Sequence, residues 1–142
     1  MKLKVRQETV TCKNCGCENN YYYLSDFSYG EWLLELDNGK YMYIYLFNND
    51  VWEDLNKIID SIKTNTKMRK VEPLKYQEAF LETCDNTVML NSNKCKGCGE
   101  NDFQGTLTKS KFTEIEVISP SHDNWRALEF DKKYSIIERI IR

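Results

Sequence analysis

The chain contains Cys-Lys-Asn-Cys-Gly at residues 12–16 and a near copy, Cys-Lys-Gly-Cys-Gly, at residues 95–99. Two residues between paired cysteines let both thiolates converge on one metal ion, and four thiolates complete a tetrahedral shell. The glycine directly after each pair tolerates the tight turn that this geometry requires. The sequence therefore predicts a structural zinc site with four ligands: Cys12, Cys15, Cys95 and Cys98.

A long excursion, residues 16–94, separates the two cysteine pairs. Closing a loop of that length in an unfolded chain costs roughly 4 kcal/mol of conformational entropy. Structural zinc binding contributes on the order of 10–16 kcal/mol in small finger peptides, which exceeds that cost. We therefore expect one Zn²⁺ to hold the two pairs together, and its removal to loosen or unfold the protein.

The two glycine-terminated pairs resemble those of zinc-ribbon and zinc-knuckle folds. The resemblance covers the two turns and their flanking strands, and it implies metal binding without implying an activity. The long excursion departs from a compact ribbon. We expect a split zinc ribbon in a single domain, residues 1–142, with knuckles at 2–27 and 87–108, an α/β insertion at 28–86, and C-terminal strands and a helix at 109–142.

The apolar pattern predicts an α+β fold, with a mainly antiparallel sheet and two or three helices. An Asn-Gly pair at residues 38–39 separates apolar runs at 31–36 and 40–47, which is the strongest short-range signal for a β-hairpin. The second of these runs is apolar on both faces and predicts a central strand. Further strands are predicted at 2–11, 20–27, 87–90, 103–108, 112–118 and 125–130.

Three segments have helical periodicity. Asp50 is expected to cap a helix over residues 50–63, with Glu53 at the capping-box position. Its apolar face consists of Val51, Leu55, Ile58, Ile59 and Ile62. Pro73 suits the first turn of a helix over 74–84, and Asp131 is expected to cap a final helix. On that last helix, one face is expected to carry Tyr134, Ile137, Ile140 and Ile141.

The remaining cysteines and the single histidine allow two interpretations. Cys17 can replace a ligand, although the tetrahedral shell is complete without it, and Cys84 reads as a buried small apolar residue. His122 lies in a Ser-Pro-Ser-His-Asp turn and reads as a surface residue; the alternative is a catalytic base with Cys17 or Cys84 as nucleophile. A redox role for the cysteine pairs is less favoured because no βαβ pattern surrounds them. Since zinc-hydrolase, phosphate-loop and nucleophile-elbow motifs are missing from the sequence, we expect no enzyme.

The N-terminus has no signal-peptide pattern, and the longest apolar run, residues 41–47, is too short to cross a bilayer. We therefore expect a cytoplasmic protein that does not associate with membranes. The formal net charge is −2, which argues against general affinity for nucleic acid.

Acidic and aromatic residues gather between residues 21 and 54, and basic residues follow them. Ordinary sheet packing and a solvated surface explain much of this pattern. The functional interpretation is a zinc-stabilised protein that binds a basic protein partner, similar in size and charge to small immunity or inhibitor proteins. Its expected contact residues are Glu31, Trp32, Glu35, Asp37, Tyr41 and Tyr43. The alternative is a zinc-ribbon nucleic-acid or transcription-associated factor, with phosphate contacts from Lys63, Lys67, Arg69, Lys70 and Lys75.

Overall fold

A computed structural model describes residues 1–24, 29–85, 94–101, 103 and 111–142. Its elements are β1 (Lys2–Thr11), β2 (Glu18–Tyr23), β3 (Glu31–Glu35), β4 (Tyr41–Tyr45), α1 (Asp50–Thr66), α2 (Pro73–Glu82), β5 (Lys111–Ile118), α3 (Asp123–Arg126) and α4 (Phe130–Ile141). The α+β class is confirmed, and the described residues form four helices where two or three were predicted.

The chain divides into two compact units, and each is assembled from two separate stretches of sequence. Met1–Ile44 and Met89–Ser119 form the sheet unit, whereas Tyr45–Val88 and Pro120–Arg142 form the helical unit. The single domain expected for residues 1–142 stays a prediction.

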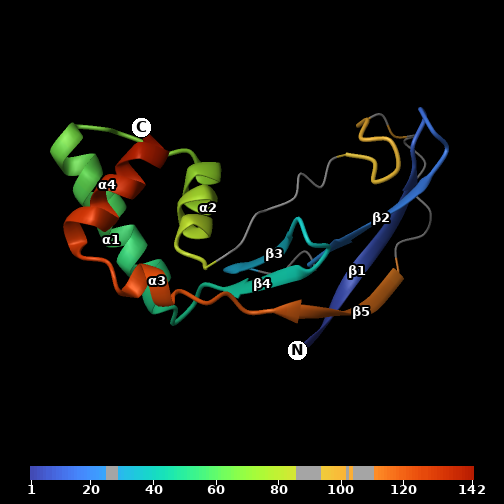
Figure 1. The fold of residues 1–142 in the computed structure, drawn as a ribbon, viewed down its shortest axis with the longest axis horizontal. Helices are drawn as coiled ribbons and strands as arrows, with labels where there is room; N and C mark the ends of the chain where they lie inside the picture. The colour runs from blue at the N-terminus through green and yellow to red at the C-terminus, as the bar shows by residue number, and fades with distance from the viewer. Residues whose placement is uncertain (25–28, 86–93, 102, 104–110) are drawn as a thin grey trace. The chain divides into compact units, whose positions relative to one another are not determined.

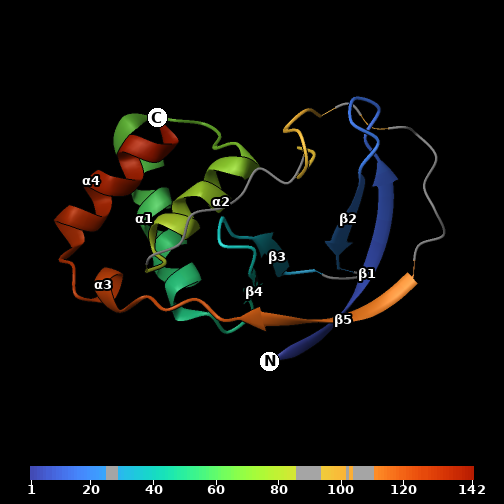
Figure 2. The same ribbon diagram turned by 45° about the vertical axis from the view of Figure 1, so that its right-hand side comes forward.

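The sheet unit contains a five-stranded sheet in the order β2-β1-β5-β4-β3. β1 pairs antiparallel with both β2 and β5, and β4 pairs parallel with β5. Figures 1 and 2 both show β1 and β5 side by side. The sheet is therefore mixed, and a mainly antiparallel ribbon stays a prediction. Its core includes Val5, Leu34, Leu36, Met42, Ile44 and Val117, all buried.

The predicted hairpin over residues 31–47 is confirmed, because β3 and β4 are sheet neighbours joined by a tight turn. Leu36 N–H donates to the Lys40 carbonyl at 2.8 Å, and Gly39 adopts a φ of +80° that favours glycine. β4 lies between β5 and β3, as expected for a central strand.

Helix α1 buries the five apolar residues that its periodicity predicted, from Val51 to Ile62. The prediction of its cap was wrong by one residue. The Asn49 side chain accepts a hydrogen bond from Trp52 N–H at 3.0 Å, and Asp50 is the first helical residue. Asn49 has an extended backbone, as an N-cap requires, and its side chain satisfies one of the free N–H groups of the first turn.

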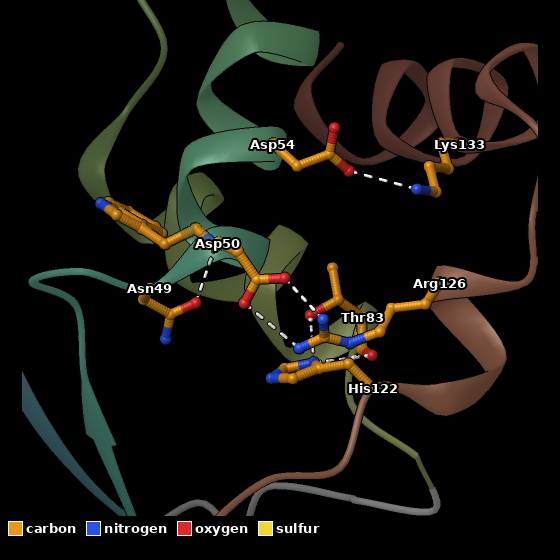
Figure 3. A network of polar contacts seen from close by, with 8 residues as sticks. Asn49, Asp50, Asp54, Thr83, His122, Arg126 and Lys133 are labelled. Carbon is orange, nitrogen blue, oxygen red and sulfur yellow. Dashed lines mark hydrogen bonds and ion pairs between the residues drawn. The ribbon is translucent and has the colours of Figure 1, made fainter.

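Helix α4 contacts both α1 and α2 in the helical unit. Ile137 and Ile141 are buried from α4, and Lys133 Nζ forms an ion pair with Asp54 of α1 at 3.2 Å, which Figure 3 shows from close by. The expected cap was wrong here too: Glu129 precedes the helix without a side-chain cap bond, and Asp131 lies in its first turn. An acidic residue in that turn still interacts favourably with the helix dipole.

The strand predicted at residues 125–130 is wrong, because the short helix α3 and the start of α4 occupy this stretch. The carboxylate of Asp85, which is distant in sequence, stabilises a helical turn here in place of a strand. Asp85 accepts hydrogen bonds from Asp123 N–H at 3.0 Å and Asn124 N–H at 3.3 Å, and so satisfies the free amides at the start of α3. Trp125 is then buried from a helical turn.

The expectation that His122 lies on the surface is also wrong. Its side chain is buried against Phe80, with Nδ1 3.0 Å from the Thr83 carbonyl oxygen and 3.1 Å from the Thr83 hydroxyl (Figure 3). Cys84 is buried, as predicted, and its thiol donates to the Phe80 carbonyl at 3.5 Å. Both polar side chains thus have hydrogen-bond partners inside the helical unit.

The other strand predictions have mixed outcomes. The first matches β1, and that for residues 112–118 matches β5 with one more residue at its start. The return strand predicted at 20–27 is seen as Glu18–Tyr23, and its residues 25–27 lie outside the described residues. The strand predicted at 87–90 and most of that at 103–108 also lie outside them.

Candidate metal centre

The first knuckle follows directly from the end of β1. Cys12 N–H donates to the Cys17 carbonyl at 2.9 Å, and Gly16 N–H donates back to the Cys12 carbonyl at 2.9 Å. Gly16 has a φ of +75°, in the left-handed region that a side chain disfavours. These bonds close a turn that carries Cys12 and Cys15 on one side.

The second knuckle has the same hydrogen bonds at the same spacing. Cys95 N–H donates to the Glu100 carbonyl at 2.7 Å, and Gly99 N–H donates to the Cys95 carbonyl at 2.8 Å. Gly99 has a φ of +79°. The repeated sequence thus folds into a repeated backbone turn, which explains the glycine at both positions.

The two knuckles bring four sulfur atoms together. Cys12 Sγ lies 3.6 Å from Cys98 Sγ, Cys15 Sγ lies 3.6 Å from Cys95 Sγ, and all four lie within 4.8 Å of one another. A tetrahedral zinc ion with Zn–S bonds of about 2.3 Å separates its sulfur ligands by about 3.8 Å. The four predicted ligands therefore lie at a spacing that can hold a metal ion of this kind.

A buried amide that the sequence interpretation missed joins the two knuckles. Asn19 is 3% exposed, and its Nδ2 donates to Cys95 Sγ at 3.3 Å and to the Cys17 carbonyl at 3.4 Å. Its Oδ1 accepts from Lys96 N–H at 2.9 Å. The Asn19 side chain is thus hydrogen-bonded to the backbone of both knuckles and to the sulfur of the candidate ligand Cys95. A buried Asn in an exposed-looking polar run, residues 18–20, gives no sequence signal for this role.

Hydrogen bonds to sulfur help to give the thiols of the site different pKa values. Donation by the Asn19 amide, supported by backbone N–H groups of the second knuckle, lowers the pKa of Cys95 to about 6. Donation by Asn14 Nδ2 likewise lowers the pKa of Cys98. The backbone of Cys17 acts in the same direction on Cys15, but the neighbouring sulfur atoms and desolvation together outweigh it, and the pKa of Cys15 is raised. Hydrogen-bond donation therefore favours the ionised form of both sulfurs of the second knuckle.

The predicted partner-contact residues gather on β3, β4 and the turn between them. Two of their three carboxylates are bound within the chain: Glu35 forms an ion pair with Lys96 Nζ at 2.8 Å, and Glu31 accepts a hydrogen bond from the Tyr43 hydroxyl. Asp37 is exposed on the turn. The Glu35 side chain is only 8% exposed. Because Lys96 belongs to the second knuckle, this ion pair also links β3 to that knuckle.

Cys17 lies beside the four sulfurs without belonging to the close group. Its Sγ is 2.9 Å from the point where a Cβ on Gly97 would stand, and Cys15 Sγ is 3.5 Å from the same point. Gly97 therefore leaves room for a fifth sulfur at the edge of the site. Both Cys15 and Cys17 are exposed.

Burial raises the pKa of Cys84 to about 11, so its thiol is protonated at neutral pH. Its hydrogen bond goes to a backbone carbonyl, and the His122 Nδ1 contacts go to Thr83. Within the described residues, these contacts do not join Cys84 to His122 as a nucleophile and a base.

Comparison of the chain with protein families, curated proteins and solved structures found no match. In the described part of the chain, every helix is too short or too polar to cross a membrane.

Proposed function

We propose that Cys12, Cys15, Cys95 and Cys98 bind one Zn²⁺ as a structural ion, and that the protein acts by binding another protein. The observation that carries the first part is the pair of matching knuckles, whose four sulfurs lie within 4.8 Å of one another. Four thiolates fill a tetrahedral zinc shell and leave no open position for a substrate, which is the pattern of structural sites.

The metal is proposed to stabilise the sheet unit in particular. The knuckles lie at residues 12–16 and 95–99 of that unit, and the segment between them includes α1 and α2 of the helical unit. Zinc binding on the order of 10–16 kcal/mol exceeds the roughly 4 kcal/mol needed to close such a loop. Metal removal should therefore loosen the sheet unit.

Elemental analysis of untagged protein tests the metal proposal. We expect one zinc per chain, lost in Cys98→Ser and retained in Cys84→Ser, since Cys84 is a buried cysteine of the helical unit. Finding no zinc in the unmodified chain, or equal zinc in both variants, would overturn it.

Protein binding is proposed for the β3–β4 hairpin surface, defined as Glu31, Trp32, Glu35, Asp37, Tyr41 and Tyr43. Trp32, Tyr41 and Tyr43 are partly exposed, and aromatic side chains beside carboxylates suit a protein partner with a basic surface. An inhibitor or immunity-type role in the cytoplasm agrees with such a contact. Glu31 and Glu35 have partners within the chain. Of the three carboxylates on this surface, Asp37 is therefore the most available to another molecule.

Co-purification from the native cell followed by mass spectrometry identifies the partner, and charge reversal then tests the surface. Asp37→Lys should weaken capture of that partner, whereas the matched control Asp60→Lys, at an exposed position on α1, should not. Equal capture by both variants would remove this surface from consideration.

Nucleic-acid binding is the second candidate, and one observation favours it. Lys67, Arg69 and Lys70 are exposed on the segment between α1 and α2, where phosphates can reach them. Lys63 and Lys75 flank this segment on the two helices. Retention on single- or double-stranded nucleic acid that falls steeply with salt, and that is lost on replacing Arg69 and Lys70 by Gln, would support this candidate over the first.

A further inference from the structure

A fifth cysteine lies next to an exposed candidate ligand. Gly16, with its left-handed backbone, turns the chain between Cys15 and Cys17. The two sulfurs lie 3.5 Å and 2.9 Å from one point beside Gly97, and both residues are exposed. Cys17 is held in this position by its carbonyl, which accepts from Cys12 N–H and from Asn19 Nδ2.

We propose that Cys17 is a site of oxidation by hydroperoxides, and that its oxidation links it to Cys15 and opens the metal centre. This inference rests on the proposed zinc site. The geometry favours Cys17 as the first sulfur to react, because it is exposed and stands outside the four-sulfur group that would share a metal.

The reaction requires a peroxide as the oxidant. The Cys17 thiol sulfur attacks the terminal oxygen of the hydroperoxide, and the O–O bond breaks. The thiol proton passes to the departing oxygen, so a sulfenic acid forms together with one water from hydrogen peroxide, or one alcohol from an alkyl hydroperoxide. Cys15 then attacks the Cys17 sulfur as a thiolate, the S–O bond breaks, and hydroxide leaves as the disulfide forms. Two electrons pass from the two sulfurs to the peroxide, so the atoms and charges balance without another reactant.

The disulfide removes Cys15 from the ligand set. Cys12, Cys95 and Cys98 then remain, and three thiolates hold a structural zinc less tightly than four. A disulfide needs its two Cα atoms about 4.4–6.8 Å apart, and two cysteines separated by one residue in a turn can meet this limit. A thiol reductant should restore the original ligands.

The test follows zinc release with a chromogenic chelator after addition of hydrogen peroxide. Zinc content is measured first, because a chain without zinc refutes the proposed metal site and not the role of Cys17. Cys17→Ser should slow release on the order of tenfold, since the sulfur that reacts first is gone. Cys84→Ser removes a buried thiol of the helical unit and should release zinc like the unmodified chain.

Peptide mapping without reduction identifies the product. We expect a Cys15–Cys17 disulfide that forms together with zinc release and disappears with dithiothreitol. A zinc-loaded Cys17→Ala or Cys17→Ser protein that releases zinc as fast as the unmodified chain would overturn the proposal. A disulfide that excludes Cys17 would overturn it as well.

Discussion

Replacing Asn19 by Ala tests whether one buried amide organises the metal centre. The substitution removes the donor to Cys95 Sγ, the donor to the Cys17 carbonyl and the acceptor for Lys96 N–H. Outer hydrogen-bond partners of metal ligands typically change metal affinity by about 10–100-fold, which corresponds to about 1.4–2.7 kcal/mol. We expect a loss of zinc affinity in that range.

The unpaired Lys96 N–H adds a cost to folding of the sheet unit. A buried donor left without its partner costs about 1–3 kcal/mol, unless water reaches it. Asn19→Ala should therefore lower the free energy of unfolding of the zinc-loaded protein in addition to lowering its zinc affinity.

Competition with a chelator of known affinity measures the first effect, and denaturant unfolding measures the second. Asn14→Ala is the matched control, because Asn14 is exposed and donates to Cys98 Sγ over a longer distance of 3.5 Å. Its zinc affinity should fall less than that of Asn19→Ala.

Asn19→Asp separates the role of the donor from that of shape. An aspartate keeps an acceptor for Lys96 N–H, but it cannot donate to sulfur and places a negative charge beside the Cys95 thiolate. We expect it to bind zinc more weakly than Asn19→Ala. If Asn19→Asp binds zinc as the unmodified chain does, or if Asn14→Ala is as harmful as Asn19→Ala, the reasoning about Asn19 is refuted.

Three further predictions concern single groups. Because the pKa of Cys95 in the metal-free chain is lowered to about 6, its thiolate stabilises the folded unit above its ordinary pKa and loses this contribution as the pH falls through 6. Zinc affinity measured by chelator competition should fall more steeply with pH below 6 than above it, because below 6 Cys95 too must lose a proton before it binds the metal. Gly99→Ala meets no atom within 4 Å but forces a side chain into a φ of +79°, so denaturant unfolding should show a loss of about 1–2 kcal/mol. Asp85→Ala removes the acceptor for two amides of α3 and should cost about 1 kcal/mol in thermal unfolding of the helical unit, whereas Asp85→Asn should retain part of that stability.

The candidate ligands could be predicted from sequence because the spacing within each knuckle is a local property. Two residues between cysteines and a glycine after each pair determine how each turn folds, wherever the turn lies in the chain. The apolar face of α1 was predictable for the same reason, since a helix repeats its own surface every few residues. In both cases residues close together in the sequence determine the local structure.

Asn19 shows what a local pattern cannot predict. Its partners Cys95 and Lys96 lie far along the chain, and an Asn in a polar run is most often exposed. Only the return of the second knuckle to the end of β1 gives this amide these two partners.

The strand prediction for residues 125–130 was wrong for a similar reason, namely a contact with a segment distant in sequence. Apolar residues suggested a strand, but Asp85 supplies acceptors to the amides of Asp123 and Asn124 and stabilises a helical turn there. Turns are usually solvated, which predicts a surface position for His122, yet Thr83 and Phe80 both contact its ring. Contacts from a distant segment outweighed local preference in both cases.

The position of β5 in the sheet has a consequence for how the protein is made. β5 lies between β1 and β4, yet it is the last of the five strands to leave the ribosome. The β1–β2 and β3–β4 pairs can form early as local hairpins, but the strand that separates them arrives only after both helices α1 and α2 have been synthesised. Joining such remote partners slows folding, so the nascent chain keeps two open strand edges until translation is nearly complete.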